Sequence, residues 1–356
     1  MNFNITVLPG DGIGPEVIEQ GIKVLGSIEK KYGHKFSYDY KLMGAVAIDA
    51  TGNPLPDETI ESCLSSDAVM LGAIGDPKYD NDPTAKVRPE QGLLKLRKSL
   101  GLFANIRPVT LYPELEELSP LKKERLEGVD FVVYRELTGG LYFGEKGRNE
   151  ARDVAFDNCE YSAEEIIRVS KLAFETAMVR EKKLTLVDKA NVLETSRLWR
   201  ETVQELSKSY PEVKVEYMFV DNAAMQIIVN PAQFDVVVTE NLFGDIITDE
   251  ASVLSGSLGL LPSASVGNKV AMFEPIHGSY PQAAGKDIAN PIATIMSVAM
   301  MLDHLKLYKE AKDIREAVSA SFDAKIMSSD LTKDNPSGTK AIGDFVAAQV
   351  LETALA

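Results

Sequence analysis

FDVVVTENLFGDIITDE (234–250) is the stretch on which the fold prediction rests. It reads as a buried strand (DVVVT), a turn through Asn241 and Gly244, and the first turn of a helix. Asp245 and Asp249 stand four residues apart, so a helix places both carboxylates on one face. Acidic residues are also common in a first helical turn, where they favour the helix dipole, so this pair alone predicts no site.

Two further apolar runs end in polar residues. LTLVDKAN (184–191) stops at Asp188 and Lys189, and VEYMFVDN (215–222) stops at Asp221. A helical pattern follows each run, and three successive strand–helix units predict a parallel sheet and an α/β fold.

In parallel sheets the ligand crevice lies outside the carboxyl ends of the strands. Lys189, Asp221 and Asp245, with Asp249 one turn further on, are therefore expected at one rim. Three carboxylates beside a lysine favour a divalent cation with oxygen ligands, together with a group that transfers a proton.

The first strand, Asn4 to Leu8, leads into the glycine-rich turn PGDGIGPE. Gly10, Gly12 and Gly14 give the spacing GxGxG, whereas the dinucleotide fingerprint requires GxGxxG. The pattern predicts a tight strand-to-helix turn close to a ligand, not a Rossmann phosphate site.

Three arginines are candidates for carboxylate binding, because the planar guanidinium suits bidentate pairing. Arg97 lies in a predicted helix, Arg107 follows in ANIRP, and Arg135 ends the strand DFVVYRE. Singly, each is better explained as a salt-bridge residue. Arg135 stands out because it ends a strand, as Lys189 does.

Two polar segments are predicted to be functional. TGGLYFGEKGRNEAR (138–152) reads as a hairpin or as an arm that reaches a second subunit. Tyr142 is a candidate proton donor, and a tyrosine that merely packs in a hairpin is the alternative. IHGSYPQAAGKDIANP (276–291) is a long polar loop between a strand and an apolar helix, and such loops often bind ligands.

Composition excludes several classes of protein. The formal charge of 38 minus 53, or -15, argues against nucleic acid or an anionic membrane as the main partner. Cys63 and Cys159 form no CxxC pair, so neither a disulfide framework nor a zinc site is predicted. The N-terminus shows no signal-peptide pattern and no apolar run reaches membrane-spanning length, so we expect a cytoplasmic protein.

Six motifs in order carry a family resemblance that runs nearly end to end: LPGDGIGPE, LLKLRKSLGLFANIRP, RELTGGLYFG, DKANVLETSRLWR, NLFGDIITDEASVLSGSLGLLPSAS and EPIHGSYPQAAGKDIANP. With these motifs the sequence resembles the β-decarboxylating dehydrogenases, the isocitrate/isopropylmalate dehydrogenase family. The resemblance implies a two-domain α/β fold with a mostly parallel sheet and a non-Rossmann NAD site.

The resemblance also implies the domain bounds and the assembly. A discontinuous NAD-binding domain would comprise residues 1–104 and 257–356. A second domain, 105–256, would carry the dimer interface and an arm near 138–160. The family forms homodimers in which the two subunits share each active site.

The family's site residues carry over by motif. The resemblance implies that the carboxylates of the malate moiety bind Arg97, Arg107 and Arg135. It also implies that Tyr142 and Lys189 take the acid–base roles, with Lys189 coming from the partner subunit. Asp245 and Asp249, with Asp221 of the partner subunit, would hold Mg²⁺ or Mn²⁺, and Asp221 would also contact substrate. Leu93 and Leu94, with Val192 of the partner subunit, would line the pocket for the isopropyl group. The adenosine end of NAD would lie among Glu274, His277, Gly278, Ser279, Tyr280 and Asn290.

The implied reaction is the NAD-dependent oxidative decarboxylation of (2R,3S)-3-isopropylmalate to 4-methyl-2-oxopentanoate and CO₂, a step of leucine biosynthesis. Leu93 and Leu94 favour an aliphatic substituent over the third carboxylate of isocitrate. D-malate or tartrate are the nearest alternative substrates. Gln282 stands where NAD-specific members of the family commonly have an aspartate, so NAD is expected with weaker exclusion of NADP. A non-catalytic regulatory subunit or a nucleotide-binding scaffold are the non-enzymatic alternatives.

Overall fold

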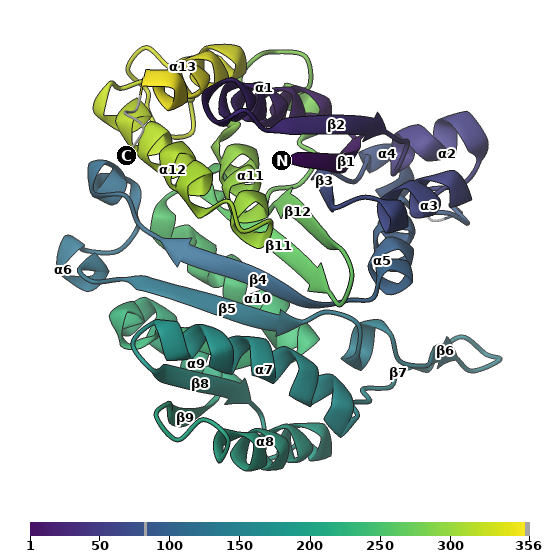
Figure 1. Cartoon of the computed structure of the whole chain (residues 1–356). Coiled ribbons are helices and arrows are strands. Elements are labelled where there is room, and N and C mark those ends of the chain that lie inside the picture. The colour runs from purple at the N-terminus through teal and green to yellow at the C-terminus, as the bar shows by residue number, and fades with distance from the viewer. Residues whose placement is uncertain (82–83, 353–356) are drawn as a thin grey trace. The chain divides into compact units, whose positions relative to one another are not determined.

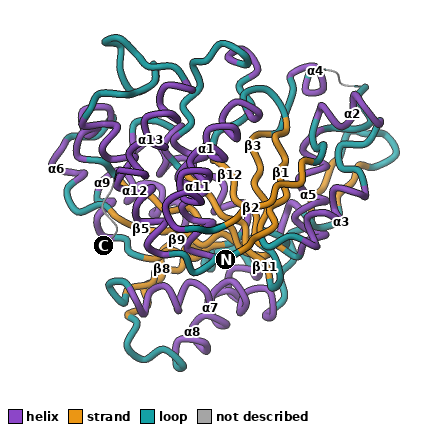
Figure 2. Tube along the Cα trace, turned by 45° about the horizontal axis from the view of Figure 1, so that its top comes forward, coloured by secondary structure: helices purple, strands orange, loops and turns teal. Residues whose placement is uncertain are grey.

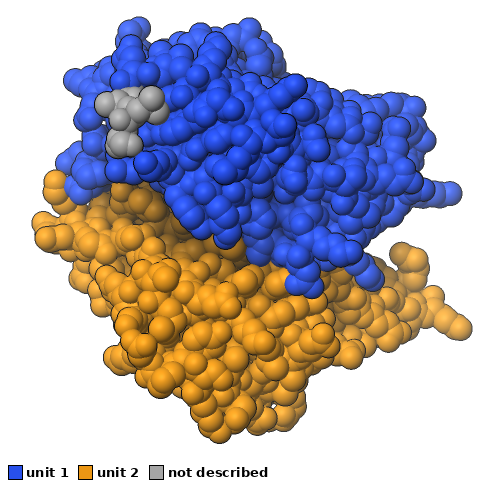
Figure 3. Space-filling model, viewed as in Figure 1, with its two compact units in different colours: residues 1–102, 112–118, 256–356 blue, residues 103–111, 119–255 orange. Residues whose placement is uncertain are grey.

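The computed structural model of the chain describes residues 1–81 and 84–352. The chain forms two compact units, shown in blue and orange in Figure 3. Unit 1 comprises residues 1–102, 112–118 and 256–356, and unit 2 comprises residues 103–111 and 119–255. The segment 112–118 belongs to unit 1, although the predicted second domain included it. Its first residue explains this, because the Tyr112 ring packs edge-on against Phe322 with centroids 4.8 Å apart.

The sheet of unit 1 has the strand order β2-β1-β3-β12-β11. The pairs of β1 with β2, β1 with β3, and β3 with β12 are parallel, and β11 runs antiparallel to β12. Its strands are β1 (Asn2–Gly10), β2 (Lys35–Tyr40), β3 (Ala68–Ala73), β11 (Pro262–Gly267) and β12 (Ala271–Pro275). The helices are α1 (Gly14–Tyr32), α2 (Ala45–Thr51), α3 (Asp57–Ser65), α4 (Pro77–Asp80), α5 (Pro89–Leu100), α11 (Ile292–His304), α12 (Tyr308–Asp323) and α13 (Thr339–Glu352) (Figure 1).

The sheet of unit 2 has the order β4-β5-β10-β8-β9. Strands β5, β10, β8 and β9 run parallel, and β4 pairs antiparallel with β5. The strands are β4 (Leu102–Thr110), β5 (Asp130–Glu136), β8 (Lys183–Asp188), β9 (Lys214–Phe219) and β10 (Val236–Thr239). The helices are α6 (Lys123–Leu126), α7 (Ala163–Val179), α8 (Glu194–Ser207), α9 (Val220–Val229) and α10 (Asn241–Ser252). Figure 2 shows the strands in orange with helices in purple around them. The predicted α/β class with mostly parallel strands is confirmed.

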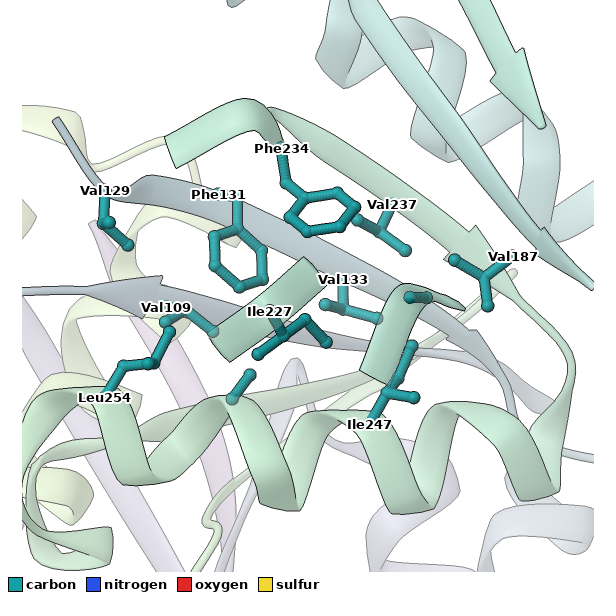
Figure 4. Packing of buried hydrophobic residues seen from close by; sticks show 12 residues of the cluster. Val109, Val129, Phe131, Val133, Val187, Ile227, Phe234, Val237, Ile247 and Leu254 are labelled. Carbon is teal, nitrogen blue, oxygen red and sulfur yellow. The ribbon is translucent and has the colours of Figure 1, made fainter. Parts of the chain in front are cut away.

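One hydrophobic cluster of unit 2 lies between its sheet and the helices α9 and α10. Alternate residues of the strands point to this face, as the period of a β-strand requires, and meet apolar residues of the two helices. The rings of Phe131 and Phe234 lie 5.7 Å apart at the centre of the cluster. Figure 4 shows the packed side chains, among them Val133, Val187, Ile227, Val237, Ile247 and Leu254. This packing fixes α10 against the sheet edge where the polar residues stand.

Two local features of unit 2 differ from the sequence prediction. Asn241 and Gly244 are helical, so the predicted turn through them is wrong. Glu240 caps α10 directly after β10 by accepting a hydrogen bond from the backbone N of Phe243 at 2.9 Å. The predicted hairpin begins later than 138: β6 (Lys146–Arg148) pairs with β7 (Ala155–Asp157), and Tyr142 ends a preceding 3₁₀ turn, η2 (Gly140–Tyr142).

None of the helices described is both long and apolar enough to cross a membrane.

Candidate active site

The carboxyl edge of the unit 2 sheet collects the predicted polar residues. In the parallel register Arg135 of β5 lies opposite Thr239 of β10, which lies opposite Val187 of β8. Lys189 follows β8, and Asp221 and Asp245 stand in the helices that follow β9 and β10. The prediction that these residues lie at one rim is therefore confirmed.

Asp245 is the centre of a cluster that includes Arg135 and Tyr142. Arg135 is buried and forms an ion pair through Nη1 with Oδ1 of Asp245. The hydroxyl of Tyr142 donates to Oδ2 of Asp245 at 2.7 Å. Burial of the phenol, together with its bond to the Asp245 carboxylate, raises the pKa of Tyr142 to about 12. Tyr142 is thus protonated at neutral pH, as a proton donor must be.

Arg107 brings Asp249 into the same cluster. Its Nη1 donates to Oδ1 of Asp249 at 3.0 Å and to the Thr248 hydroxyl at 2.7 Å, and its Nε donates to Oδ1 of Asn105 at 2.8 Å. The Asp249 side chain remains 67% exposed, whereas that of Arg107 is 11% exposed. Two fixed arginines therefore face two carboxylates that are open to solvent or to a ligand.

Lys189 and Asp221 form a separate pair within the chain. The Lys189 Nζ donates to Oδ1 of Asp221 at 2.8 Å, and this bond holds the pKa of the Asp221 carboxyl below its usual range. The lysine also lies over the Phe219 ring, 5.7 Å from its centroid. Val192 follows on the surface with 62% of its side chain exposed.

The three aspartates do not form one cation site within a chain. Among residues 1–81 and 84–352, no group of three or more His, Cys, Asp or Glu side chains is placed to hold a metal. Asp245 and Asp249 share a helix face, while Asp221 is bonded to Lys189. The three carboxylates of one chain are therefore not gathered around one point.

The predicted site residues of unit 1 lie on α5, on β12 and in the loop after β12. Leu93 and Leu94 are half-buried on α5. Arg97 Nη2 donates to Oε1 of Glu274 at 3.0 Å. The Nε of Arg97 is buried and meets no hydrogen-bond acceptor among the residues described, so it remains a donor for a bound ligand.

A cavity of about 470 Å³ lies beside the predicted cofactor loop of unit 1. Its lining includes Ile13, His277, Gly278, Tyr280 and Asn290. The Nε2 of His277 is buried and has no partner in the described part of the chain, while Nδ1 lies 2.9 Å from the Gly278 carbonyl oxygen. Desolvation lowers the pKa of His277, which keeps the ring neutral at physiological pH. Tyr280 adopts a left-handed backbone with φ of 38°, a conformation that costs energy for residues other than glycine.

The glycine-rich N-terminal turn supports this loop. The backbone N of Ile13 donates to the Ser279 carbonyl oxygen at 2.8 Å. Gly12 has φ of +58°, and a Cβ there would lie 2.0 Å from that oxygen. Only glycine allows this approach. The turn therefore comes close to the cofactor loop through its backbone, which the GxGxG spacing did not reveal.

Sequence reasoning missed two residues that organise these sites. Asn241 is buried and accepts hydrogen bonds from Arg135, yet it was assigned to a turn. Asp330 lines the cavity and accepts a hydrogen bond from Asn290 Nδ2 at 3.0 Å. It lies in a polar loop without periodicity, where only proximity in the fold shows its role.

Comparisons of the chain with a family model and with individual proteins indicate the same family. The model of the family described as isocitrate/isopropylmalate dehydrogenase matches residues 4–346. A 3-isopropylmalate dehydrogenase of Bacteroides fragilis is 56% identical over 348 residues, which cover 97% of this chain and 98% of the relative. One of Halalkalibacterium halodurans is 52% identical and covers 97% of each chain.

Solved structures agree in fold. Isocitrate dehydrogenase from Methylococcus capsulatus superposes with a TM-score of 0.88 at 34% identity, covering 98% of this chain and 99% of that one. A β-decarboxylating dehydrogenase from Thermococcus kodakarensis gives a TM-score of 0.81 at 34% identity, with 98% and 96% covered. The chain belongs to the isocitrate/isopropylmalate dehydrogenase family.

Proposed function

We propose that the protein is a cytoplasmic homodimeric enzyme that oxidises and decarboxylates (2R,3S)-3-isopropylmalate with NAD, yielding 4-methyl-2-oxopentanoate and CO₂ for leucine biosynthesis. The observation that carries the proposal is the cluster of Arg107, Arg135 and Tyr142 around Asp245 and Asp249. It occurs in a chain that is 56% identical to a 3-isopropylmalate dehydrogenase.

The charges of the cluster suit a malate bound together with a cation. Arg107 and Arg135 balance Asp245 and Asp249, so the four side chains are neutral together. A malate with two carboxylates and a divalent cation add equal and opposite charges, which preserves the balance. The arginines would then bind substrate carboxylates with Arg97, while the aspartates turn to the cation.

The exposed apolar residues on α9 and α10 support a shared site. Met225 lies four residues after Asp221, and Val253 four after Asp249, so each apolar side chain shares a helix face with a carboxylate. Both are more than half exposed, as is Ile246. A second copy covering this face through a twofold axis would bring Asp221 of the partner subunit towards Asp245 and Asp249.

The residues present fit a hard cation, because oxygen ligands on carboxylates suit Mg²⁺ or Mn²⁺. Asp245 and Asp249, with Asp221 of the partner subunit, would hold it, and when bound it would neutralise negative charge on the C2 oxygen. Lys189 of the partner subunit takes the proton of the C2 hydroxyl, directly or through a water, and NAD, when bound, would accept the hydride from C2. The β-keto acid then loses CO₂, and Tyr142 protonates the enolate carbon.

Leu93 and Leu94, with Val192 of the partner subunit, would form the pocket for the isopropyl group. An apolar pocket offers no hydrogen bond to a third carboxylate, which disfavours isocitrate. D-malate and tartrate remain the alternatives of the same chemistry, and a substrate panel separates them.

The adenosine end of NAD would occupy the unit 1 cavity, beside His277, Gly278, Ser279, Tyr280 and Asn290, with Glu274 near the ribose. The buried Nε2 of His277 supports this, because it is a polar atom that a ligand can satisfy. Gln282 can hydrogen-bond a ribose but does not repel a 2′-phosphate. The expected kcat/KM is higher for NAD than for NADP, and equal values would contradict NAD specificity.

The test is NADH formation by the purified protein with 3-isopropylmalate, NAD and Mg²⁺, with a chelator control and with D-malate and isocitrate in parallel. Metal-dependent turnover strongest on 3-isopropylmalate is expected. Strong turnover on another malate would keep the chemistry and reject the alkyl pocket. A folded dimer inactive on every malate would favour a regulatory subunit or a nucleotide-binding scaffold.

A further inference from the structure

We infer that Asn241 is a positioning residue that fixes the Arg135 guanidinium and the turn of Tyr142 in one geometry, and that its neutral side chain is required for anion binding. The inference rests on the proposed function, because it assigns Arg135 to the carboxylates of the substrate and Tyr142 to proton transfer.

Asn241 holds one edge of the Arg135 guanidinium. Nε and Nη2 of Arg135 donate to Oδ1 of Asn241 at 3.1 and 2.8 Å. Nη1 points the other way, to Asp245. A guanidinium is planar, so two donors on one acceptor fix the plane and hence the direction of Nη1. A ligand or cation at Asp245 can change the contact on the Nη1 side without disturbing the Asn241 side.

The same asparagine is tied to the segment that carries Tyr142. Its Nδ2 donates to the Gly139 carbonyl oxygen at 3.2 Å, directly before the η2 turn that ends at Tyr142. Its backbone N donates to the Tyr161 hydroxyl at 2.9 Å. Asn241 is 1% exposed, so water does not replace these contacts. One side chain therefore connects the arginine with the backbone that places the proton donor.

The surrounding glycines show that this arrangement is closely packed. A Cβ on Gly244 would lie 2.6 Å from Cγ of Arg135, and a Cβ on Gly140 would lie 2.3 Å from the Tyr161 hydroxyl oxygen. The arginine stem crosses α10 at Gly244, three residues after Asn241, where no side chain is in its way. The hydrogen-bonded side chains have little room to shift. Loss of the Asn241 amide should therefore change the positions of both the Arg135 guanidinium and the Tyr142 hydroxyl.

An amide differs from a carboxylate at this position in charge. An asparagine oxygen accepts from Arg135 without cancelling its positive charge, which stays available to an anionic substrate. An aspartate of the same shape would pair with the guanidinium and add a buried negative charge near Glu136 and Glu240, whose pKa values burial already raises.

The experiment compares Asn241→Ala and Asn241→Asp with Asn53→Ala. Asn53 also accepts a hydrogen bond through its Oδ1, from the backbone N of Leu55 at 3.1 Å, but it belongs to unit 1. Steady-state kinetics with 3-isopropylmalate, NAD and Mg²⁺ give KM for each substrate and kcat. Calorimetric titration with 3-isopropylmalate measures anion binding without turnover.

Both Asn241 variants should lower kcat/KM for 3-isopropylmalate by about tenfold or more, the loss typical of a hydrogen bond to a charged group, while KM for NAD changes less than about twofold. Asn241→Asp, which keeps the shape, should not restore the parental kinetics, because its carboxylate would pair with Arg135 and cancel the positive charge that the substrate needs. Asn53→Ala should keep the parental kinetics.

Parental affinity for 3-isopropylmalate in Asn241→Asp, or equal changes in KM for NAD and for the malate, would overturn the inference. If Asn241→Ala does not fold, the kinetics and the 3-isopropylmalate affinity of the isosteric variant Asn241→Asp decide whether the inference holds. A parent that turns over no malate contradicts the proposed function, and the calorimetric affinities then decide the positioning role separately.

Discussion

Within one chain the Nζ of Lys189 lies 2.8 Å from Oδ1 of Asp221, whereas Asp245 is bonded to Arg135 and Tyr142. The proposed proton acceptor, Lys189, is thus bonded to one proposed metal ligand, Asp221. The proposed proton donor, Tyr142, is bonded to a different one, Asp245. In a dimer with shared sites, each active site would take Lys189 and Asp221 from one subunit and Asp245 and Tyr142 from the other. This division can be tested with inactive variants.

Lys189→Ala and Asp245→Asn homodimers should each be inactive, and mixing them after reversible dissociation should restore activity. In the mixed dimer one site receives only intact groups, so random pairing in equal amounts gives about a quarter of the parental rate. The measurement is NADH formation before and after exchange of subunits.

The control mixture is Lys189→Ala with Asp221→Asn. Every site of that mixed dimer contains one damaged member of the bonded pair, so activity should stay absent. Rescue in this mixture, or failure of the first mixture despite proven exchange, would show that the site is not divided in this way.

Cation binding should stabilise the folded protein, and the gain should grow with the logarithm of the free cation concentration above its Kd. At Mn²⁺ about 100 times its Kd, the parent should gain about 2.7 kcal/mol against unfolding. Asp245→Asn and Asp249→Asn should lose most of this gain, which denaturation with and without Mn²⁺ measures. Asp57→Asn is the matched control, because that side chain is 86% exposed on α3. Equal stabilisation of all four proteins would mean that the cation binds elsewhere.

Most of unit 2 was predictable because its strands are apolar runs that end in polar residues. The parallel direction of β8, β9 and β10 followed from the alternation of strands and helices, but their order in the sheet did not. The division of the aspartates did not, because spacing along the chain cannot tell whether Asp221 meets Lys189 or Asp245. The start of α10 was missed because Glu240 caps the helix, a role more often filled by Asp, Asn, Ser or Thr. Asn241 was consequently assigned to a turn.

Leu93→Ser should lower the preference for 3-isopropylmalate over D-malate by about tenfold, because a polar side chain would no longer favour the alkyl group. The ratio of kcat/KM values for the two substrates measures this. Leu64→Ser on α3, where the leucine is 51% exposed, is the control and should leave the ratio unchanged. An unchanged ratio in Leu93→Ser would remove Leu93 from the pocket.

His277 should cause the free energy of unfolding to decrease as the pH falls below about 6.5. Its pKa is lowered by burial in the folded chain, whereas an unfolded histidine titrates near about 6.5. Between these two pKa values the unfolded chain binds more protons, so the stability present above about pH 6.5 is lost as the pH decreases. Urea denaturation of the parent and His277→Asn, above and below that pH, should show a smaller acid loss in the variant.

His304 is a useful comparison, since burial lowers its pKa as well. The double variant His277→Asn with His304→Asn should lose still less stability in acid. If His277→Asn loses as much stability at low pH as the parent, the His277 ring has the same pKa in the folded and the unfolded chain.

Strand β3 is buried along its whole length and lies between β1 and β12, yet β12 is synthesised some two hundred residues later. At ribosomal rates of about 5–20 residues per second, the open edge of β3 waits for roughly 10–40 s. Unit 2 is nearly contiguous and is completed during that interval. Unpaired strand edges promote association between chains. The nascent protein is therefore most exposed to aggregation while its second half is being translated, when its N-terminal strands have no partner to close their sheet.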